Sequence, residues 1–368
     1  MQRKLLWMVK SDKIQYKGSK MRALAESEDL FDDSKLDRKS KAYKEAVKNL
    51  EKAQQLGFKV VTFIDKEYPD SLRNSPTPPA VLYVSGNVNA LRHGAFAGIV
   101  GSRICDEYGL RISGSLAFDI SQTGVGIVSG GAKGIDAAAH MGALRGKAVT
   151  VAVLGSGLDR PYPEVNIPLF ERIVKNGGAV ISEFPFGEPP NKRNFPRRNK
   201  IIAAMSDAVI VARAAARSGA LITANHADSY GKAVFAVPGN VDSPLSAGTN
   251  ALIRDGVTPC MSAMDVLDEI ILRKPDFFTT KDKPQLAEEE PPQNIIKEDK
   301  PIRKVALSPI ETEVFEAITA GKQTFEQIED SVSFDGARLT AVLGMLELKG
   351  IISRDFDKKY KLKAGGEC

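Results

Sequence analysis

Six short apolar runs, each followed by an amphipathic segment, constrain this chain more than any other feature of its sequence. A strand that is apolar throughout is typical of a parallel sheet that is buried on both faces. Strands that alternate with helix-like segments indicate successive βαβ units. The sequence therefore predicts a Rossmann-like, doubly wound, mostly parallel α/β sheet. The predicted strands are Phe96–Val100, Gly126–Val128, Val149–Leu154, Ala179–Ile181, Ala208–Val211 and Ala233–Val237.

Changes in composition divide the 368 residues into four parts. Residues 1–65 are rich in Lys, Glu, Asp and Ser and predict a small helical domain, SAM-like or helix-hairpin-helix-like, that ends in a strand at 59–64. Residues 66–273 contain the predicted sheet and form the second predicted domain. Residues 274–304 are rich in Pro, Glu and Lys and indicate a linker. Residues 305–364 contain three helical segments and two short strands, which suggests a winged-helix-like domain.

Composition also narrows the class of protein. The net charge of +5 permits a nucleic-acid partner without requiring one. Cys105, Cys260 and Cys368 stand far apart, which argues against a disulfide scaffold or a zinc site and fits a reducing compartment. No apolar run approaches the length of a membrane span, and the N-terminus does not resemble a signal peptide. We expect a cytoplasmic protein with no membrane partner.

Two glycine-containing segments directly follow predicted strands, where an open α/β sheet binds its ligands. Gly101, Ser102 and Arg103 offer a close backbone approach, a hydroxyl donor and a planar fork for phosphate. A tight turn with a solvated arginine explains them at least as well. The segment 129–136 suggests a phosphate cradle, although it matches neither the dinucleotide fingerprint nor the Walker pattern. Its candidate DNA-binding residues are Ser129, Gly130, Gly131, Lys133 and Gly134.

The segment Lys192–Lys200 carries the strongest binding signal. It contains five basic residues, no acidic residue and a phenylalanine in the middle. Basic groups neutralise successive phosphates, and Phe195 can stack on an unpaired base. A solvated basic loop is the alternative, but the position after the fourth strand favours binding. The candidate DNA-binding residues here are Lys192, Phe195, Arg197, Arg198, Asn199 and Lys200.

After the fifth strand, Ser218 and Gly219 also belong to the candidate DNA-binding set. They either begin a helix that offers backbone donors to an anion or form a simple cap, and the sequence favours neither.

The titratable residues do not assemble into a catalytic pattern. Asp136 and His140 lie four residues apart on one helix face, but no third metal ligand is evident. We interpret Asp136 as a brace of the glycine-rich loop and His140 as a packed or hydrogen-bonded side chain. Glu183 is interpreted as structural, and no serine occupies a Gly-x-Ser-x-Gly elbow. We expect no catalytic residues, no metal and no cofactor.

Together these segments resemble the DNA-processing protein A family (DprA, also called Smf). The resemblance covers roughly residues 60–270, and many short matches in order are far more specific than any one of them. It rests on Tyr68-Pro69, Pro78–Tyr83, Val100–Arg103, Ser129–Asp136 with His140, Ser182-Glu183, Phe195–Ala203, Ser218–Thr223, Val237–Gly239 and Gly248–Ile253.

The resemblance implies a protein that binds and protects incoming single-stranded DNA and helps to load RecA recombinase during natural transformation. It also implies a homodimer formed through the Rossmann-like domain, with Arg103, Lys192, Phe195 and the glycine-rich loop lining the DNA groove. Two residues depart from the family pattern. Lys200 stands where Arg is usual, which loses a bidentate fork. Arg213 stands where an acidic residue is usual, which adds positive charge near the groove.

Two other functions fit parts of the sequence. A nucleotide-phosphate-handling enzyme on a related fold would use the loops at Ser129 and Ser218, but the Pro-Gly-Gly-x-Gly-Thr pattern of such enzymes is absent. A DNA-binding regulator would read duplex with the segment 335–349, where only Arg338 and Lys349 are basic. We therefore expect the C-terminal part to contact proteins.

The segment Met261–Ile271 has apolar residues at helical spacing. It is either a self-complementary dimer patch or an ordinary core helix.

Overall fold

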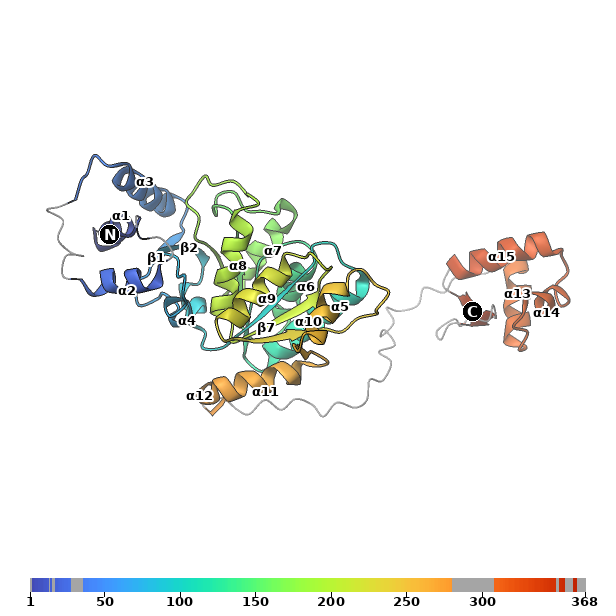
Figure 1. The fold of residues 1–368 in the computed structure, drawn as a ribbon. Coiled ribbons are helices and arrows are strands. Elements are labelled where there is room, and N and C mark those ends of the chain that lie inside the picture. Colours follow the sequence, from blue (N-terminus) through green and yellow to red (C-terminus); the bar gives the residue numbers. More distant parts are fainter. Residues whose placement is uncertain are drawn as a thin grey trace. The chain divides into compact units, whose positions relative to one another are not determined.

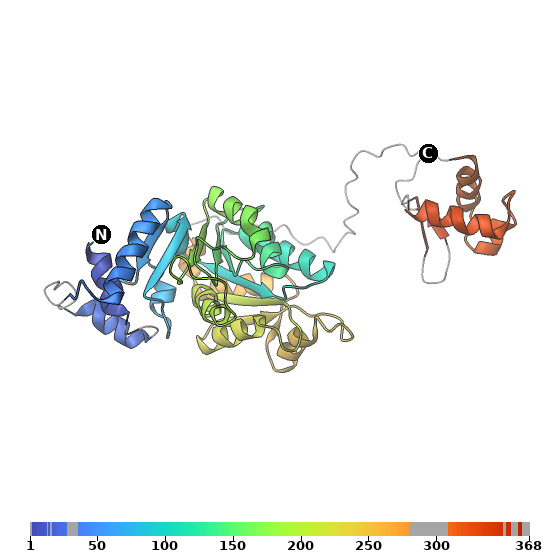
Figure 2. The same cartoon turned by 90° about the horizontal axis from the view of Figure 1, so that it is seen from above.

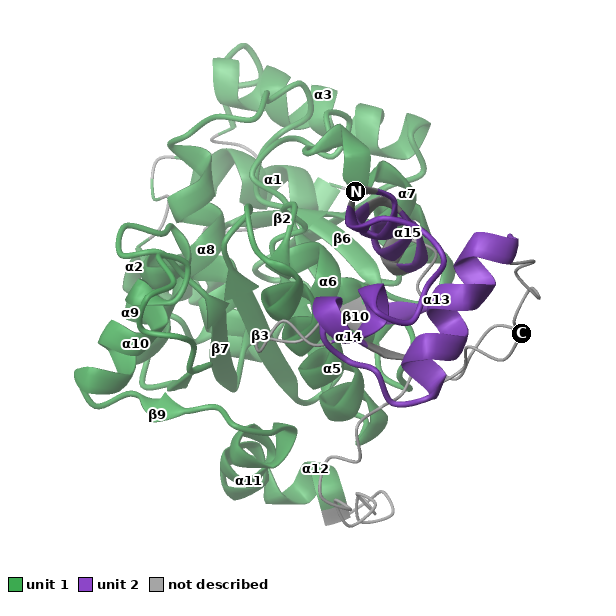
Figure 3. Ribbon diagram, turned by 90° about the vertical axis from the view of Figure 1, so that its right-hand side faces the viewer, with its two compact units in different colours: residues 1–287 green, residues 288–368 purple. Residues whose placement is uncertain are grey.

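A nine-stranded sheet with helices on both faces organises most of the molecule (Figure 1, Figure 2). The computed structural model describes residues 2–12, 14, 17–27, 36–279, 308–348, 351–354 and 360–362. The chain folds as two units, Met1–Ala287 and Glu288–Cys368, which Figure 3 colours separately.

Seven adjacent strands, from β6 to β9 across the sheet, pair in parallel with one another, and β1 and β2 extend one edge by antiparallel pairing. The order across the sheet is β1-β2-β6-β5-β4-β3-β7-β8-β9, in which the pairs β1–β2 and β2–β6 are antiparallel. The strands are β1 Lys59–Thr62, β2 Val81–Gly86, β3 Phe96–Gly101, β4 Gly126–Ser129, β5 Thr150–Val153, β6 Ala179–Ser182, β7 Ala208–Arg213, β8 Ala233–Ala236 and β9 Thr258–Pro259.

The six predicted strands correspond to β3 to β8, and the predicted fold class is confirmed. These strands are apolar throughout because alternate side chains enter two different cores. In β7, Val209 and Val211 pack with α8 and α9, whereas Ala208 and Ile210 pack with α5, α6 and α11. Strand β2 was not predicted, because its apolar run follows a Pro-Pro pair and the strand is not part of a βαβ unit.

The helices of the first unit connect the strands and cover both faces. Their bounds are α1 Gln2–Ser11, α2 Gly18–Glu26, α3 Lys41–Gln55, α4 Asp70–Arg73, α5 Glu107–Gln122, α6 Ile135–Ala143, α7 Ile167–Lys175, α8 Asn194–Met205, α9 Ala220–Ser229, α10 Ala247–Arg254, α11 Ala263–Arg273 and α12 Pro275–Thr279, with 3₁₀ segments η2 Val88–Arg92 and η3 Glu164–Asn166.

The N-terminal helices pack onto the edge of the same sheet. Trp7 of α1 is fully buried, donates from Nε1 to the Ala80 carbonyl at 2.8 Å, and stacks on Phe63 with ring centroids 5.5 Å apart. Strand β1, which follows α3, is the edge strand of the sheet. Residues 1–65 and residues 66–273 therefore share a sheet and a hydrophobic core.

The direction of the chain reverses between β3 and β7. From β3 the chain adds β4, β5 and β6 on one side, and then returns through α8 to place β7 on the other side of β3. Strands β3 and β7 pair in parallel, with Ala97 opposite Ala208. Loops that leave the carboxyl ends of such a pair diverge, and the crevice between them is where open α/β sheets bind ligands.

The second unit contains three helices and a two-stranded antiparallel hairpin. These are α13 Pro309–Thr319, α14 Phe325–Glu329, α15 Gly336–Leu348, β10 Ile352–Arg354 and β11 Tyr360–Leu362. Val314, Ile328, Leu339 and Leu346 form its core. The winged-helix assignment stays a prediction. Of the predicted linker, residues 275–279 form α12, and residues 280–304 lie outside the described residues.

None of the helices in the described ranges combines the length and the apolar character needed to cross a membrane.

Candidate nucleic-acid interface

A cavity of about 430 Å³ opens at the carboxyl ends of β3 and β7. We call it the switch-point cavity. Its walls come from the end of β3, the first turns of α8 and the loop between β7 and α9. The sequence placed these three segments at one edge of the sheet, and the structure brings them together. Nine predicted site residues line the cavity: Gly101, Ser102, Arg103, Lys192, Phe195, Arg198, Asn199, Ser218 and Gly219.

Two helix N-termini meet the cavity. Helix α8 begins at Asn194 and α9 at Ala220, and neither has a side-chain N-cap bond from its capping residue. At α9 the first backbone N–H groups donate within the turn, from Ala220 to Ser218 Oγ at 3.3 Å and from Leu221 to the Ser218 carbonyl at 3.2 Å. The positive ends of the two helix dipoles favour an anion at this place. The basic segment was predicted as a loop, but from Asn194 onward it is helical. Its residues therefore project from the first turns of a rigid element.

Exposed cations surround the cavity. Arg103 and Lys192 line it, and Lys133 lines an adjoining slot. All three side chains are exposed, and none makes an ion pair with another residue in the described part of the chain. Cations without a carboxylate partner leave their charge open to an anionic ligand, so this edge of the sheet is suited to phosphate groups.

The predicted residue Arg198 lies beneath this surface. It is 4% exposed, donates from Nη1 to the Val153 carbonyl at 3.1 Å, and lies 3.9 Å from Oδ2 of Asp136. Burial lowers the pKa of Arg198 to about 10, so the side chain is still charged at neutral pH. A Cβ atom at Gly130 would lie 1.3 Å from Nη1 of Arg198, so any side chain there would displace the guanidinium.

Asp136 braces the glycine-rich loop, as predicted from its position. Its Oδ2 accepts a hydrogen bond from the Ala132 N–H at 3.3 Å. His140 is fully buried and contacts Thr150 Oγ1 through Nδ1 at 2.7 Å. Burial, aided by the charge of Arg198, lowers the pKa of His140 to about 3 and keeps the ring neutral. No group of three His, Cys, Asp or Glu side chains among the described residues is arranged to hold a metal.

Other predicted site residues are also partly or fully withdrawn from solvent. Ser129 is buried and donates its hydroxyl to the Ile99 carbonyl at 2.6 Å. Arg197 pairs with Glu183 at 3.4 Å. Burial raises the pKa of Glu183 to about 7, and the charge of Lys200 opposes this rise. Gly130 and Lys133 line the adjoining slot, whereas Ser129, Gly131, Gly134, Arg197 and Lys200 line neither hollow.

Phe195 occupies the boundary between the cavity and the slot. The guanidinium of Arg103 lies over its ring, with Cζ 4.4 Å from the centroid. A Cβ atom at Gly155 would lie 2.8 Å from Cδ1 of Phe195, so the ring rests directly against that backbone. The phenylalanine therefore supports Arg103, and its stacking on a base stays a prediction.

A comparison with known protein families shows which family the chain belongs to. The family described as DNA recombination-mediator protein A has a sequence model that matches residues 59–271, more than half of the chain. The chain belongs to this family. The matched region holds every predicted site residue.

Known members of the DNA recombination-mediator protein A family resemble the chain in sequence and fold. Protein Smf of Synechocystis is 41% identical over 221 residues, which are 59% of this chain and 55% of the relative. The chain thus spans about half the length of that relative. The crystal structure of DNA processing protein A from Streptococcus pneumoniae is 34% identical, has a TM-score of 0.54, and covers 73% of this chain and 93% of its own.

A second solved member comes from Helicobacter pylori. It is 28% identical, has a TM-score of 0.53, and covers 59% of this chain and 97% of its own. That structure is described for its unique mode of binding single-stranded DNA.

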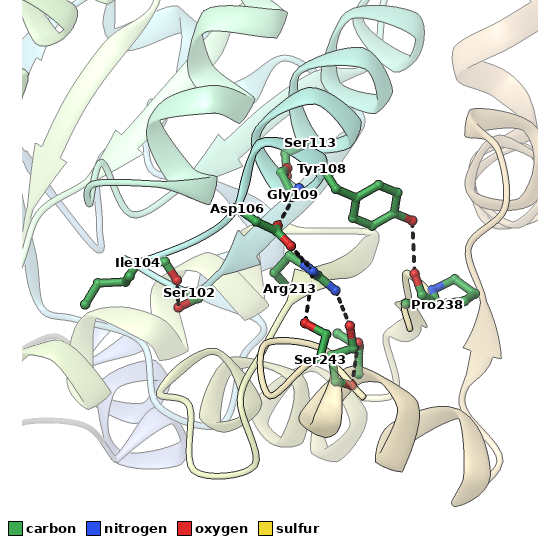
Figure 4. A network of polar contacts seen from close by, with 12 residues as sticks. Ser102, Ile104, Asp106, Tyr108, Gly109, Ser113, Arg213, Pro238 and Ser243 are labelled. Atoms are coloured by element: carbon green, nitrogen blue, oxygen red, sulfur yellow. Dashed lines mark hydrogen bonds and ion pairs between the residues drawn. The ribbon is translucent and has the colours of Figure 1, made fainter. Parts of the chain in front are cut away.

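Arg213, the departure from the family pattern, is not an open positive charge. It is buried, and it pairs with Asp106 and donates to Ser246 and to Ser243, the last at 3.4 Å (Figure 4). The hydrogen bond from Arg213 lowers the pKa of Asp106 below its usual range. The Arg213 carbonyl accepts from the Ser102 N–H at 2.8 Å. The residue therefore joins the turn after β3 to the loop before α10, and the predicted gain of groove charge is wrong.

Sequence reasoning missed several residues of this family member's site. Tyr162 and Pro163 line the slot, and Asn166 ties their loop to the glycine-rich loop. They follow β5, so the rule that ligands bind beyond carboxyl strand ends would have found them. Asp106 had no local signal, because its partner Arg213 is more than a hundred residues away.

Proposed function

We propose that this protein binds single-stranded DNA in the switch-point cavity and acts in recombination without chemistry. One observation carries the proposal: the exposed, unpaired cations Arg103 and Lys192 and the N-termini of α8 and α9 converge on one cavity. This combination suits a polyanion whose bases are accessible. The single-stranded DNA binding described for the H. pylori relative supports it.

Phosphate groups would contact Arg103 and Lys192, with Lys133 available to the next phosphate. Each such contact releases counterions, so binding should weaken steeply as salt is added. The glycine-rich loop and the helix N-termini read no base, so sequence preference should be small. Stacking on an aromatic side chain needs unpaired bases, which favours single strands over duplex.

In the cell, we propose that the protein protects incoming single-stranded DNA and helps to load RecA recombinase during natural transformation, in a bacterial cytoplasm. Membership of a recombination-mediator family supports the general role. The separated cysteines fit a reducing compartment.

We also propose that the protein acts as a homodimer through the Rossmann-like domain. In the segment 261–271, Leu267 is buried in the core of the first unit, whereas Met261 and Met264 are 72% and 37% exposed. Leu272 on the same helix is 77% exposed. These exposed apolar side chains are what a second copy would cover. Light scattering at high concentration tests this; a monomer throughout would contradict it.

A comparison of labelled single strand and matching duplex tests the main proposal. Fluorescence anisotropy at several salt concentrations should give much tighter binding of the single strand and a steep loss of affinity with salt. Equal affinity for duplex at moderate salt would overturn the proposal and favour the second unit as the DNA-binding part.

The non-catalytic part of the proposal has its own test. Nucleoside monophosphates incubated with the protein should release neither base nor phosphate. Turnover that disappears in Lys133→Ala or Glu183→Gln would replace the proposal with a nucleotide-handling enzyme.

A further inference from the structure

A shallow slot of about 40 Å³ adjoins the switch-point cavity on the far side of Phe195. It shares Arg103, Phe195 and Arg198 with the cavity, so the two hollows are neighbours. Lys133, Tyr162 and Pro163 belong to the slot alone. A strand that leaves the cavity past Phe195 therefore meets an exposed lysine and a second aromatic ring.

The two aromatic rings differ in what they offer to a base. Phe195 already carries the Arg103 guanidinium at 4.4 Å and rests against the Gly155 backbone. Tyr162 is 42% exposed, and its ring centroid is 6.3 Å from that of Phe195 at an interplanar angle of 43°. Tyr162 is thus the ring that presents open aromatic surface to solvent beside the cavity.

The loop that carries Tyr162 is held in place by hydrogen bonds at both ends. Nδ2 of Asn166 donates to the carbonyls of Gly131 and Ala132 at 2.9 and 3.1 Å. Before the tyrosine, Ser156 Oγ donates to the Arg160 carbonyl at 2.7 Å. A ring on a fixed loop loses little conformational freedom when a ligand stacks on it, which favours binding.

From this geometry we infer that Tyr162 is a second base-stacking platform, which takes the unpaired nucleobase next to the nucleotide in the switch-point cavity. Arg103 and Lys133 flank the slot and contact the phosphates of that step. The inference rests on the proposed function in one respect, that a nucleic-acid strand occupies the cavity. The ligand class is an unpaired base of any kind, because every base has a face that stacks.

The experiment uses the full chain and an oligothymidylate. Tyr162→Ala should weaken binding about 5- to 150-fold with no change in the salt slope, because a stacking contact releases no counterion. Tyr162→Phe should bind as the wild type does, since the ring is retained. Thermal melting of each variant shows whether it is folded.

A fluorescent variant gives a direct readout of base contact. Trp7 is the only tryptophan of the chain and is fully buried, so the indole introduced by Tyr162→Trp reports from the slot. Its emission should be quenched when the oligothymidylate binds. The matched control is Val165→Trp, because Val165 is 65% exposed on the same loop but does not line the slot. This control should be quenched much less.

The outcomes separate this inference from the proposed function. If Arg103→Ala and Lys192→Ala weaken binding but Tyr162→Ala does not, and the emission of the Tyr162→Trp variant stays unchanged, the second platform is wrong while the cavity stands. If none of the three alanine substitutions weakens binding, the proposed function itself fails. Quenching of both tryptophan variants to the same extent would also overturn the assignment to Tyr162.

Discussion

Gly130→Ala tests whether the buried arginine sets the shape of the DNA-binding edge. The added Cβ would lie 1.3 Å from Nη1 of Arg198, so the guanidinium must leave its place. It then loses the hydrogen bond to the Val153 carbonyl and its proximity to Asp136. Breaking a buried charge pair costs about 3–5 kcal/mol. At about 2–4 °C per kcal/mol for a domain of this size, the melting temperature should fall by about 6–20 °C.

A double variant separates this clash from a general effect of alanine in the loop. Arg198→Ala removes the group that Gly130→Ala collides with, so the second substitution should add less than about 1 kcal/mol to the first. Gly114→Ala is the matched control, because the nearest atom to its Cβ is 3.6 Å away. Calorimetry of the wild type, the two single variants and the double variant measures the coupling. A Gly130→Ala protein as stable as the wild type, or strictly additive free energies, would refute the argument.

Three further outcomes are expected. Arg103→Ala and Lys192→Ala should each weaken binding to all sequences, and each should flatten the slope of log affinity against log salt concentration by about one in titrations. Arg193 does not line the cavity, so Arg193→Ala should leave that slope unchanged. Asp106→Asn should lower stability at neutral pH, because the folded-state pKa of Asp106 is depressed. In melting curves, the difference in melting temperature from the wild type should persist above about pH 4 and disappear as the pH falls below it. Met264→Glu should convert a dimer to a monomer in light scattering without lowering the melting temperature, since the side chain is 37% exposed.

The sequence predicted the sheet well because continuous apolar runs have few alternatives to a doubly covered parallel strand. It also placed Arg103, Lys192 and Ser218 at one edge, since each lies between the end of a strand and the start of the next helix. Within Lys192–Lys200 the sequence could not separate side chains that face the cavity from side chains buried beneath it, because consecutive positions of a helix point in different directions. Lys192 is exposed at the cavity, whereas Arg198 is turned inward to the Val153 carbonyl.

Contacts between side chains far apart in the sequence could not be predicted from local sequence patterns. The partner of Arg213 is Asp106, and nothing in the sequence near either residue indicates the other. The same holds for Arg103 and Phe195, which meet only after the sheet has formed. Strand β2 was missed for a different reason, since its antiparallel pairing with β6 breaks the βαβ rule that identified the others.

The pairing of β3 with β7 also determines when, during synthesis, the cavity for the proposed DNA strand is complete. Ala97 must find Ala208, so the central pair of strands closes only after more than a hundred intervening residues have been made. Non-local pairing of this kind is slow to form, because a long loop has to be ordered first. A nascent chain that ends before β7 has the glycine-rich loop but lacks one wall of the cavity. If the proposed function holds, DNA binding therefore requires β7 and the loop after it, and ribosome-bound fragments shorter than about residue 220 should not retain DNA.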